Sequence, residues 1–271
     1  MKQWKTAPLV NSDGTISKLE IFRDNTDHRK ATQALKESNK TKDKFISIIA
    51  HDLKSPFNSL LGFTELLNNK FDDYDLNEKK KFIGIIHEGL QNSLKLLDNL
   101  LYWAQTQKGT IAYHPEKINL FLISKETSEL LNLSIKNKSI KLINQLAVNI
   151  YVKADKNMLK TIIRNLLSNA IKFTHKYGEI SISTVSMPNK EQKKFVTIKV
   201  SDTGVGISKK AQSKLFNIAE NISTKGTENE KGTGLGLILC KEFIEMHGGK
   251  IWVESEVNKG TSFFFTIPHI S

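Results

Sequence analysis

Two long stretches of the chain repeat apolar residues at alternating spacings of three and four positions. Residues 45–67 carry the first set and residues 78–108 carry the second. This spacing is typical of helices that pack against other helices. The segment 68–77 between them is rich in Asn and Asp, which predicts a loop. We therefore expect two long antiparallel helices, the first beginning near Asp27. The first set comprises Ile46, Ile49, Leu53, Leu60, Phe63 and Leu67, with Pro56 at the missing step, and the second comprises Ile83, Ile86, Leu90, Leu97, Leu100 and Ala104, widened by Leu94 and Leu101.

The two apolar stripes are too wide to be buried by one pair of helices. Pairing two such hairpins into a four-helix bundle would bury them, so we expect a homodimer. A purely structural dimerisation rod remains an alternative at this point. Within the first helix, Pro56 removes the hydrogen bond to the carbonyl of Asp52, which predicts a kink one turn beyond His51.

After Gly109 the pattern changes to shorter segments, some with helical spacing and some with strict alternation. Asp155 is a good N-cap for one of the helices, and Pro188-Asn189 predicts the loop of a hairpin. Helices interspersed with mostly antiparallel strands indicate an α/β sandwich, with helices on one face of a mixed sheet. The fold class is thus α plus α/β. The expected helices are 120–137, 155–174, 208–216 and 234–247, and the expected strands are 140–146, 149–153, 179–185, 195–200, 250–256 and 261–267.

Composition narrows the class of protein. A length of 271 residues favours two domains. No apolar run approaches the roughly 18–20 residues that span a bilayer, and no signal peptide opens the chain. We expect a soluble, cytoplasmic chain without a membrane segment, although a parent protein could carry one upstream. The single cysteine, Cys240, excludes an internal disulfide framework and its amphipathic setting predicts a buried core residue. The net charge of +12 comes from lysines along the whole chain without interleaved aromatic residues, which argues against a nucleic-acid partner.

His51 lies on the first long helix, at the position that faces solvent most directly. Counting Ile46 as heptad position a places His51 at position f, flanked by Asp52 and Lys54. An outward histidine on a rigid helix can be approached by other proteins. A lone histidine is nevertheless more often an ordinary solvated side chain, so the remaining motifs have to decide between these interpretations.

The helix 155–174 carries three polar residues opposite its apolar face. Asn165, Asn169 and Lys172 are spaced i, i+4 and i+7, so they project on one side. A solvated face is the usual explanation, but it favours charged residues over two asparagines one turn apart. Amide oxygens can bind Mg²⁺, which keeps most of its waters and phosphate oxygens. The lysine one turn on supplies the positive charge that such phosphates need.

Two glycine motifs follow in the sequence. Asp202-Thr-Gly204-Val-Gly206 comes directly after an apolar strand, where the aspartate can accept a hydrogen bond from an amine and the glycines let a flat ligand approach. Alone, this motif is equally consistent with an ordinary strand-to-helix turn. Gly232-Thr-Gly234-Leu235-Gly236 leads into a helix, where backbone N–H groups can meet a phosphate. It follows a polar loop and lacks Gly-Lys-Ser/Thr, so it is neither a dinucleotide fingerprint nor a Walker A motif.

Together with Phe216, these segments resemble the N, G1, F and G2 boxes of the Bergerat ATP-binding fold. With AHDLKSPFNSLLGF around His51 as an H box, residues 40–268 resemble a sensor histidine kinase of two-component systems. Residues 8–27 predict two short strands around an Asp-Gly turn and resemble the end of a PAS sensor domain. The implied domains are a PAS end and linker at 1–27, a dimerisation and histidine-phosphotransfer hairpin at 28–108, and a catalytic ATP-binding domain at 109–271.

The resemblance implies an enzyme that uses ATP and Mg²⁺ to phosphorylate its own histidine. It then passes the phosphoryl group to an aspartate on the receiver domain of a separate response regulator. His51 is implied as the phosphoacceptor, Asp52 as the acid that orients or deprotonates it, and Ser55 as the residue that places water in a weak phosphatase activity. Asn169 is implied as the Mg²⁺ ligand. The implied nucleotide-binding residues are Asn165, Lys172, Phe173, Asp202, Gly204, Gly206, Lys231, Gly232, Gly234, Leu235 and Gly236.

Three features depart from the family pattern. Ile218 stands where the F box usually has a second phenylalanine. The lid has no arginine, so Lys225 and Lys231 are its available cations and lack bidentate geometry. Ser55 occupies a position where many phosphatase-competent relatives have Thr or Asn.

Two other functions stay open on the sequence alone. A Bergerat-fold ATPase such as a chaperone or topoisomerase subunit would have a glutamate at the position of Asn165, because hydrolysis needs a group that activates water. Asn165 cannot act as a base, which argues against this reading. A non-catalytic dimeric scaffold with a degenerate nucleotide pocket would account for the unusual lid.

Overall fold

The computed structural model of the chain describes residues 3–23, 26–107, 112–185, 194–217, 224–228, 230 and 234–270. The chain divides into two compact units, Met1–His51 and Asp52–Ser271. In the first unit, strands β1 (Gln3–Val10) and β2 (Ile16–Arg23) pair antiparallel. The carboxylate of Asp13 accepts hydrogen bonds from the backbone N–H and hydroxyl of Thr15, which fixes the turn. The predicted pair of strands around Asp-Gly is confirmed, with the first strand beginning five residues earlier than expected.

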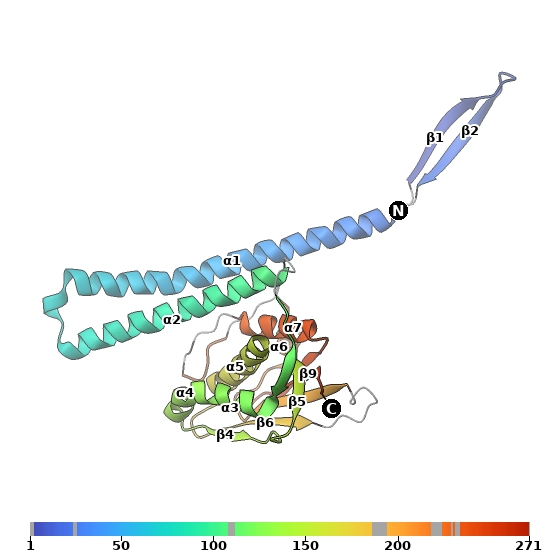
Figure 1. Cartoon of the computed structure of the whole chain (residues 1–271). Helices are drawn as coiled ribbons and strands as arrows, with labels where there is room; N and C mark the ends of the chain where they lie inside the picture. The colour runs from blue at the N-terminus through green and yellow to red at the C-terminus, as the bar shows by residue number, and fades with distance from the viewer. Residues whose placement is uncertain are drawn as a thin grey trace. The chain divides into compact units, whose positions relative to one another are not determined.

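The two long helices are present, and the predicted loop connects them. Helix α1 spans Thr26–Asn69 and continues through Pro56, the short 3₁₀ helix η1 spans Phe71–Asp73, and α2 spans Leu76–Gln107 (Figure 1). Near the loop the ring of Phe82 packs on those of Phe63 and Tyr74, with centroid separations of 5.4 and 4.9 Å. Among the described residues no helix is both long and apolar enough to cross a bilayer.

The hairpin buries a narrower face than the apolar stripe predicted for α2. Gly89 lies against the side chain of Leu60, while Ser93 and Leu96, four and seven residues later, are buried. The predicted stripe itself is largely exposed in the single chain. Its exposed members are Ile83, Leu90, Leu94, Leu97 and Leu101, with exposed fractions between 44% and 61%. A single hairpin therefore leaves about half of each of these five side chains exposed.

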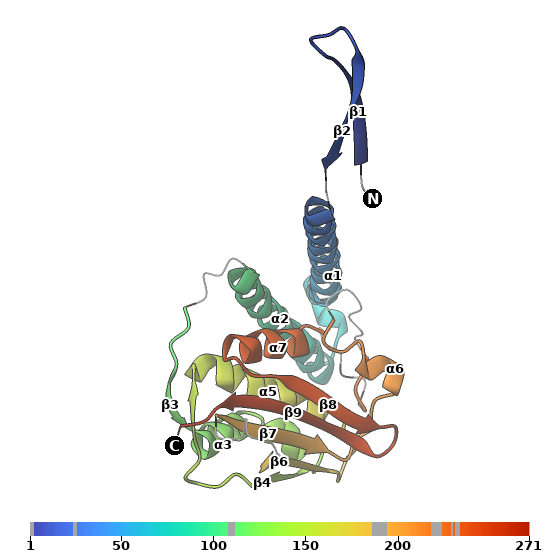
Figure 2. The same ribbon diagram turned by 90° about the vertical axis from the view of Figure 1, so that its right-hand side faces the viewer.

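A five-stranded sheet, a separate pair of strands and five helices make up the described residues after α2. The strand order is β4-β6-β7-β9-β8, with only β4 and β6 parallel, and a separate antiparallel pair joins β3 and β5. Figure 2 shows the helices gathered on one face of this sheet. The strands are β3 (Glu116–Asn119), β4 (Lys141–Asn144), β5 (Tyr151–Ala154), β6 (Glu179–Val185), β7 (Phe195–Asp202), β8 (Ile251–Glu256) and β9 (Gly260–Pro268), and the helices are α3 (Leu120–Leu130), α4 (Asn132–Asn137), α5 (Lys156–Phe173), α6 (Lys209–Gln212) and α7 (Gly236–Met246).

Helix α5 is the centre of the core because it lies between α3 and α7 and against β6 and β7. Its apolar face is completely buried, as periodicity predicted, and the alternating residues of β6, β7 and β9 meet it from the sheet. The side chains of this core that are at most 1% exposed include Leu159, Ile162, Ile163, Leu166, Leu167, Ile180, Ile182, Ile198, Phe243, Phe265 and Ile267.

Several expected elements differ from those in the structure. The expected helix 120–137 is two helices, because the chain leaves helical geometry at Leu131. The expected helix 208–216 ends at Gln212 and continues only as turns. Strand β3 was missed, since its four residues are too few to show a period. The strands expected at 140–146 and 149–153 are shorter, and they belong to different sheets.

His247 joins the end of α7 to the start of α5. Asp155 caps α5 by accepting from the N–H groups of Asn157 and Met158, and its own backbone N–H donates to His247 Nε2 at 2.9 Å. The other ring nitrogen, Nδ1, donates to the carbonyl of Phe243 at 2.6 Å. Both contacts require a neutral ring with its proton on Nδ1, and burial lowers the pKa of His247 from 6.5.

We expect His247→Leu to lower the free energy of unfolding at pH 7.5 by about 1–3 kcal/mol, because it leaves the buried N–H of Asp155 without an acceptor. The loss should shrink towards acidic pH. His247 binds its proton less readily folded than unfolded, so its contribution is complete above 6.5 and is lost as the pH falls towards its lowered pKa. Urea unfolding of both proteins at pH 7.5 and 5.5 measures this difference. If the variant loses the same free energy of unfolding at both pH values, the pH-dependent role of His247 is wrong.

Candidate functional site

The polar face of α5 lies opposite its buried face, and it carries the three residues predicted from spacing. Asn165, Asn169 and Lys172 are all partly buried. The Asn169 side chain makes no hydrogen bond within the described part of the chain, so its amide oxygen is available to a ligand. The cap at Asp155 and the apolar contacts on the opposite face hold α5 in place. The three polar side chains therefore project from one fixed side of the helix.

Asn165 lies against the first residue of α7. A Cβ at Gly236 would come 3.2 Å from its Oδ1, so glycine lets the two helices meet closely there. The amide Nδ2 of Asn165 is enclosed and has no hydrogen-bond partner among the described residues, an arrangement that costs folding free energy. Cys240 is fully buried as predicted, and burial raises the pKa of its thiol to about 12, so it is chemically inert.

Asp202 ends strand β7, where the sequence placed it, and is almost completely buried. Its Oδ1 accepts two backbone N–H groups, from Gly204 at 2.8 Å and Thr261 at 3.2 Å. Burial raises the pKa of Asp202 to about 6, although these two hydrogen bonds act to lower it. Oδ2 has no partner among the described residues and is not enclosed. One carboxylate oxygen is thus held in place, and the other is free to accept a hydrogen bond.

The glycines after Asp202 allow the chain to pass close to its neighbours. A Cβ at Gly204 would overlap the carbonyl oxygen of Phe173, the last residue of α5. Val205 donates to that same oxygen at 3.1 Å. Gly206 has φ +71 and lies against the carbonyl of Glu256. The loop after β7 is therefore fixed against the end of α5, which brings Asp202 and Phe173 into one site.

Lys172 donates from Nζ to the carbonyl oxygen of Thr224 at 2.7 Å, and its ammonium lies 4.6 Å from the centroid of the Phe173 ring. Burial lowers the pKa of Lys172. Thr224 belongs to the long polar loop between α6 and α7. The predicted phosphate residue is thus held by this loop in the structure, and Gly234 (φ +68) and Leu235 lead from the loop into α7.

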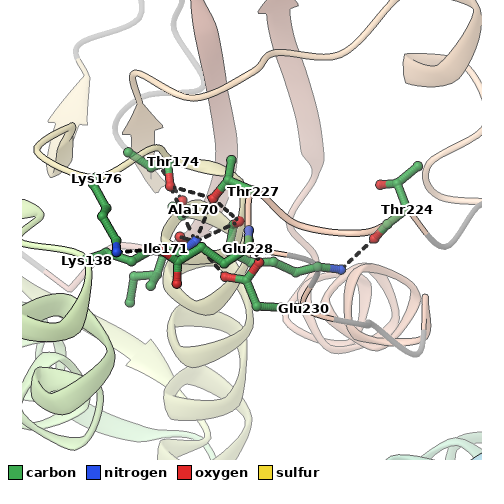
Figure 3. Close-up of polar contacts among 10 residues, drawn as sticks. Lys138, Ala170, Ile171, Thr174, Lys176, Thr224, Thr227, Glu228 and Glu230 are labelled. Atoms are coloured by element: carbon green, nitrogen blue, oxygen red, sulfur yellow. Dashed lines mark hydrogen bonds and ion pairs between the residues drawn. The ribbon is translucent and has the colours of Figure 1, made fainter.

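The structure adds three residues that the sequence did not indicate. The ammonium of the buried Lys138 joins Thr227 and Glu230 of the same loop to the C-terminal end of α5 (Figure 3). A lysine at the end of a short helix predicts a solvated side chain, so sequence spacing gave no signal for this role.

Other predicted residues lie outside what the structure describes. His51, Asp52 and Ser55 belong to α1, but the description does not extend to their side chains. Lys231 and Gly232 are outside the described residues, as is Ile218 of the predicted F box. The roles given to these residues stay predictions.

Two protein-family models match the chain. Residues 41–109 match the His Kinase A (phospho-acceptor) domain. Residues 154–271 match the family of histidine kinase-, DNA gyrase B- and HSP90-like ATPases. The first range contains His51 and the second contains every predicted nucleotide-binding residue.

Curated relatives and solved structures agree with these matches. The chain is 30% identical to the adaptive-response sensory kinase SasA of Crocosphaera subtropica, over 96% of this chain and 67% of that protein. It is 31% identical to the circadian input-output histidine kinase CikA of Synechococcus elongatus over 85% of this chain, but spans only 30% of that protein. The fold is shared with histidine kinase ThkA, solved in complex with response regulator protein TrrA, at TM-score 0.64 and 23% identity over 98% of this chain and 75% of that chain.

If Asp202 accepts the exocyclic amine of adenine, Asp202→Asn should weaken ADP binding about 10- to 100-fold, because an amide N–H would then face the amine. Wild-type affinity should also fall about tenfold one pH unit below the pKa of about 6. The proton would go to Oδ2, since Oδ1 already accepts two N–H groups. Calorimetric titration with ADP at pH 7.5 and 5.0 measures both effects.

The variant serves as the control for this pH series, because protonation of the nucleotide itself affects both proteins equally. IDP, which carries an oxygen in place of the amine, is the matched ligand. Asp202→Asn should narrow the preference for ADP over IDP. An unchanged preference would exclude Asp202 as the group that reads the base.

Proposed function

The chain belongs to the sensor histidine kinase family, and from this premise we propose that it is an ATP-dependent kinase that phosphorylates His51. ATP, when bound, supplies the γ-phosphoryl group that this histidine receives. The observation that carries the proposal is the placement of Asp202. A buried carboxylate with one fixed and one open oxygen lies beside a helix that presents amides and a lysine. This arrangement fits a base at one end and phosphates along the helix.

The residues present also fit Mg²⁺. Asn169 offers an amide oxygen that no described residue uses, and Gly236 leaves room beside Asn165. The described residues contain no group of three or more His, Cys, Asp or Glu that could hold a metal ion. We therefore propose that Asn169 is the protein ligand and that the nucleotide phosphates and water provide the remaining oxygens, as Mg²⁺ commonly prefers.

The hairpin is proposed to form a homodimer. Helix α2 carries several exposed leucines. Among them, Leu94 is 61% exposed and Leu101 is 52% exposed in the single chain. Phe57 and Leu61 of α1 are also more than half exposed. A second hairpin would cover these side chains, and the four helices would form the bundle expected from the sequence. Burying apolar surface contributes about 25 cal/mol per Å², which favours association against the entropy lost when two chains pair.

The phosphoryl group is proposed to pass from His51 to an aspartate of a response regulator receiver domain. The solved complex of ThkA with TrrA supports this partner class. Asp52 would orient or deprotonate His51, and Ser55, one helical turn later, would face the same visiting protein. The chain spans about a third of the autoinducer 2 sensor kinase/phosphatase LuxQ of Vibrio vulnificus, whose name combines both activities. A weak phosphatase activity at Ser55 is proposed on that likeness.

Hydrolysis of ATP to water is the rival activity. It needs a general base near the position of Asn165, and an amide cannot accept the proton of the attacking water. A hairpin with a phosphoacceptor-domain match would also have no role in a simple ATPase. The kinase proposal accounts for both halves of the chain.

We expect His51→Ala to abolish the incorporation of acid-labile, base-stable phosphate from labelled ATP, because phosphohistidine has this stability. ADP binding should be unchanged. The matched control is His87→Ala, which removes an exposed histidine of the same hairpin whose ring is hydrogen-bonded to Gln91. Labelling that survives in His51→Ala, or is lost equally in both variants, would refute the assignment of His51.

We expect Asn169→Ala to abolish the part of ATP affinity that depends on Mg²⁺, since it removes the proposed amide ligand. Asn169→Asp should retain the metal but place a negative charge beside the phosphates, which also lowers activity. Titration of ATP binding with Mg²⁺ separates the two effects. Asn157→Ala, an exposed position at the other end of α5, is the control. Metal dependence equal to wild type in Asn169→Ala would place the ion elsewhere.

A further inference from the structure

Lys138 is a lysine buried where charges are costly. Its exposed fraction is 4%, and it lies in the turn between α4 and β4. Its ammonium donates to three backbone carbonyls at the end of α5: Ile171 at 2.9 Å, Lys172 at 3.1 Å and Thr174 at 3.4 Å. The last carbonyls of a helix lack intrahelical partners and carry partial negative charge. Lys138 therefore satisfies the C-terminal end of α5 from a distant part of the sequence.

The same ammonium holds part of the loop between α6 and α7, Thr224–Glu228 with Glu230, which we call the lid segment. It donates to the hydroxyl of Thr227 at 2.8 Å and pairs with the carboxylate of Glu230 at 2.5 Å (Figure 3). The hydroxyl of Thr227 also donates to the carbonyl of Thr174, and the backbone N–H of Thr227 donates to the carbonyl of Lys172. Burial acts to raise the pKa of Glu230, but the hydrogen bonds from Lys138 and two backbone N–H groups outweigh it and lower the pKa.

Gly226 provides a separate sign that the lid segment is fitted to α5. A Cβ at this position would lie 2.7 Å from the carbonyl oxygen of Lys172, and closer still to its Cγ and to the carboxylate of Glu230. The N–H of Gly226 donates to the carbonyl of Glu230 at 2.9 Å, which closes the segment into a compact turn. Only a residue without a side chain allows this approach.

The contact reaches the proposed nucleotide site through Lys172. The carbonyl of Lys172 accepts hydrogen bonds from Lys138 and from Thr227, and its ammonium donates to Thr224 of the lid segment. Phe173, the next residue, contacts the loop that follows Asp202. Both ends of the Lys172 residue are thus fixed by one network that centres on Lys138.

We propose that Lys138 is a positioning residue which, through Thr227 and Glu230, holds the lid segment on the last turn of α5 and so sets the place of Lys172 and Phe173 for nucleotide binding. The proposal rests on the proposed function, because it assumes that this site binds ATP. Lys138 itself is not among the predicted nucleotide-binding residues. It acts through the two α5 residues and through the lid.

The test removes the lid side of this network and leaves Lys138 with its helix carbonyls. Lys138→Met would leave the buried carbonyls at the end of α5 without their donor, and the variant could then fail to fold. Glu230→Ala and Gly226→Ala are therefore the informative variants. The first substitution removes the carboxylate. The second adds a Cβ for which there is no room, and it changes no charge. Glu228→Ala is the matched control, because Glu228 pairs with Lys176 at 3.2 Å while both side chains are about half exposed.

Each protein is titrated with ADP by calorimetry, and autophosphorylation is measured against ATP concentration. Glu230→Ala and Gly226→Ala should raise the dissociation constant for ADP and the KM for ATP about tenfold with little change in kcat. Glu228→Ala should stay within about twofold of wild type. Glu230→Gln keeps the length and an acceptor oxygen, so it should recover part of the affinity.

Trypsin provides a readout that general destabilisation would not reproduce. Cleavage after Lys225, an exposed residue of the lid segment, should accelerate in Glu230→Ala, while cleavage after Lys259, in the exposed β8–β9 turn, should not. Wild type that fails to bind ADP would refute the proposed function. Wild type that binds ADP, with Glu230→Ala and Gly226→Ala binding equally well or better, would overturn the positioning role and leave the function standing.

Discussion

Helix α5 must bury one side completely while its other side stays polar, and most of the catalytic half of the molecule depends on this division. Its apolar side fills the space between α3, α7 and the sheet. Its polar side carries Asn165 and Asn169 and ends at Lys172. The start of the helix is capped by the adjacent Asp155, which His247 holds from far along the chain, and the end is held by the distant Lys138. A helix fixed on one face and at both ends cannot rotate, so its polar side chains keep their spacing towards a ligand.

Two buried titratable groups in this domain have opposite effects on its stability. Burial lowers the pKa of His247, so its contribution is present at neutral pH and lost in acid. Burial raises the pKa of Asp202 to about 6, so ionising it opposes folding as the pH rises through that value. The histidine is fully hydrogen-bonded and joins two helices. Asp202 keeps one carboxylate oxygen open. On the polar face of α5, the Nδ2 of Asn165 is enclosed and has no hydrogen-bond partner among the described residues. Of these two groups, Oδ2 of Asp202 is the one that is not enclosed, so it is the one to which a ligand could donate a hydrogen bond.

The periodicity of the sequence predicted most elements because local spacing determines which face of a segment is buried. The cap at Asp155, the hairpin of β6 and β7 and the face of α5 followed directly from it. Pairing between distant segments did not. The strands at Lys141 and Tyr151 are neighbours in sequence but belong to different sheets, since each pairs with a partner that no local pattern specifies. Lys138 shows the same limit for single residues, because its role depends on carbonyls and a carboxylate more than thirty residues away.

The two halves of the chain differ in what one copy can complete. The candidate nucleotide residues that the structure describes all come from α5, from β7 and its loop, and from the start of α7 with the two residues before it, all within one chain. The hairpin leaves leucines of α2 exposed, so its burial is incomplete without another copy. In the proposed function, nucleotide binding would use residues of one chain, whereas dimerisation would use the exposed face of the hairpin. A second copy would complete the burial of the hairpin without supplying any of the described nucleotide residues.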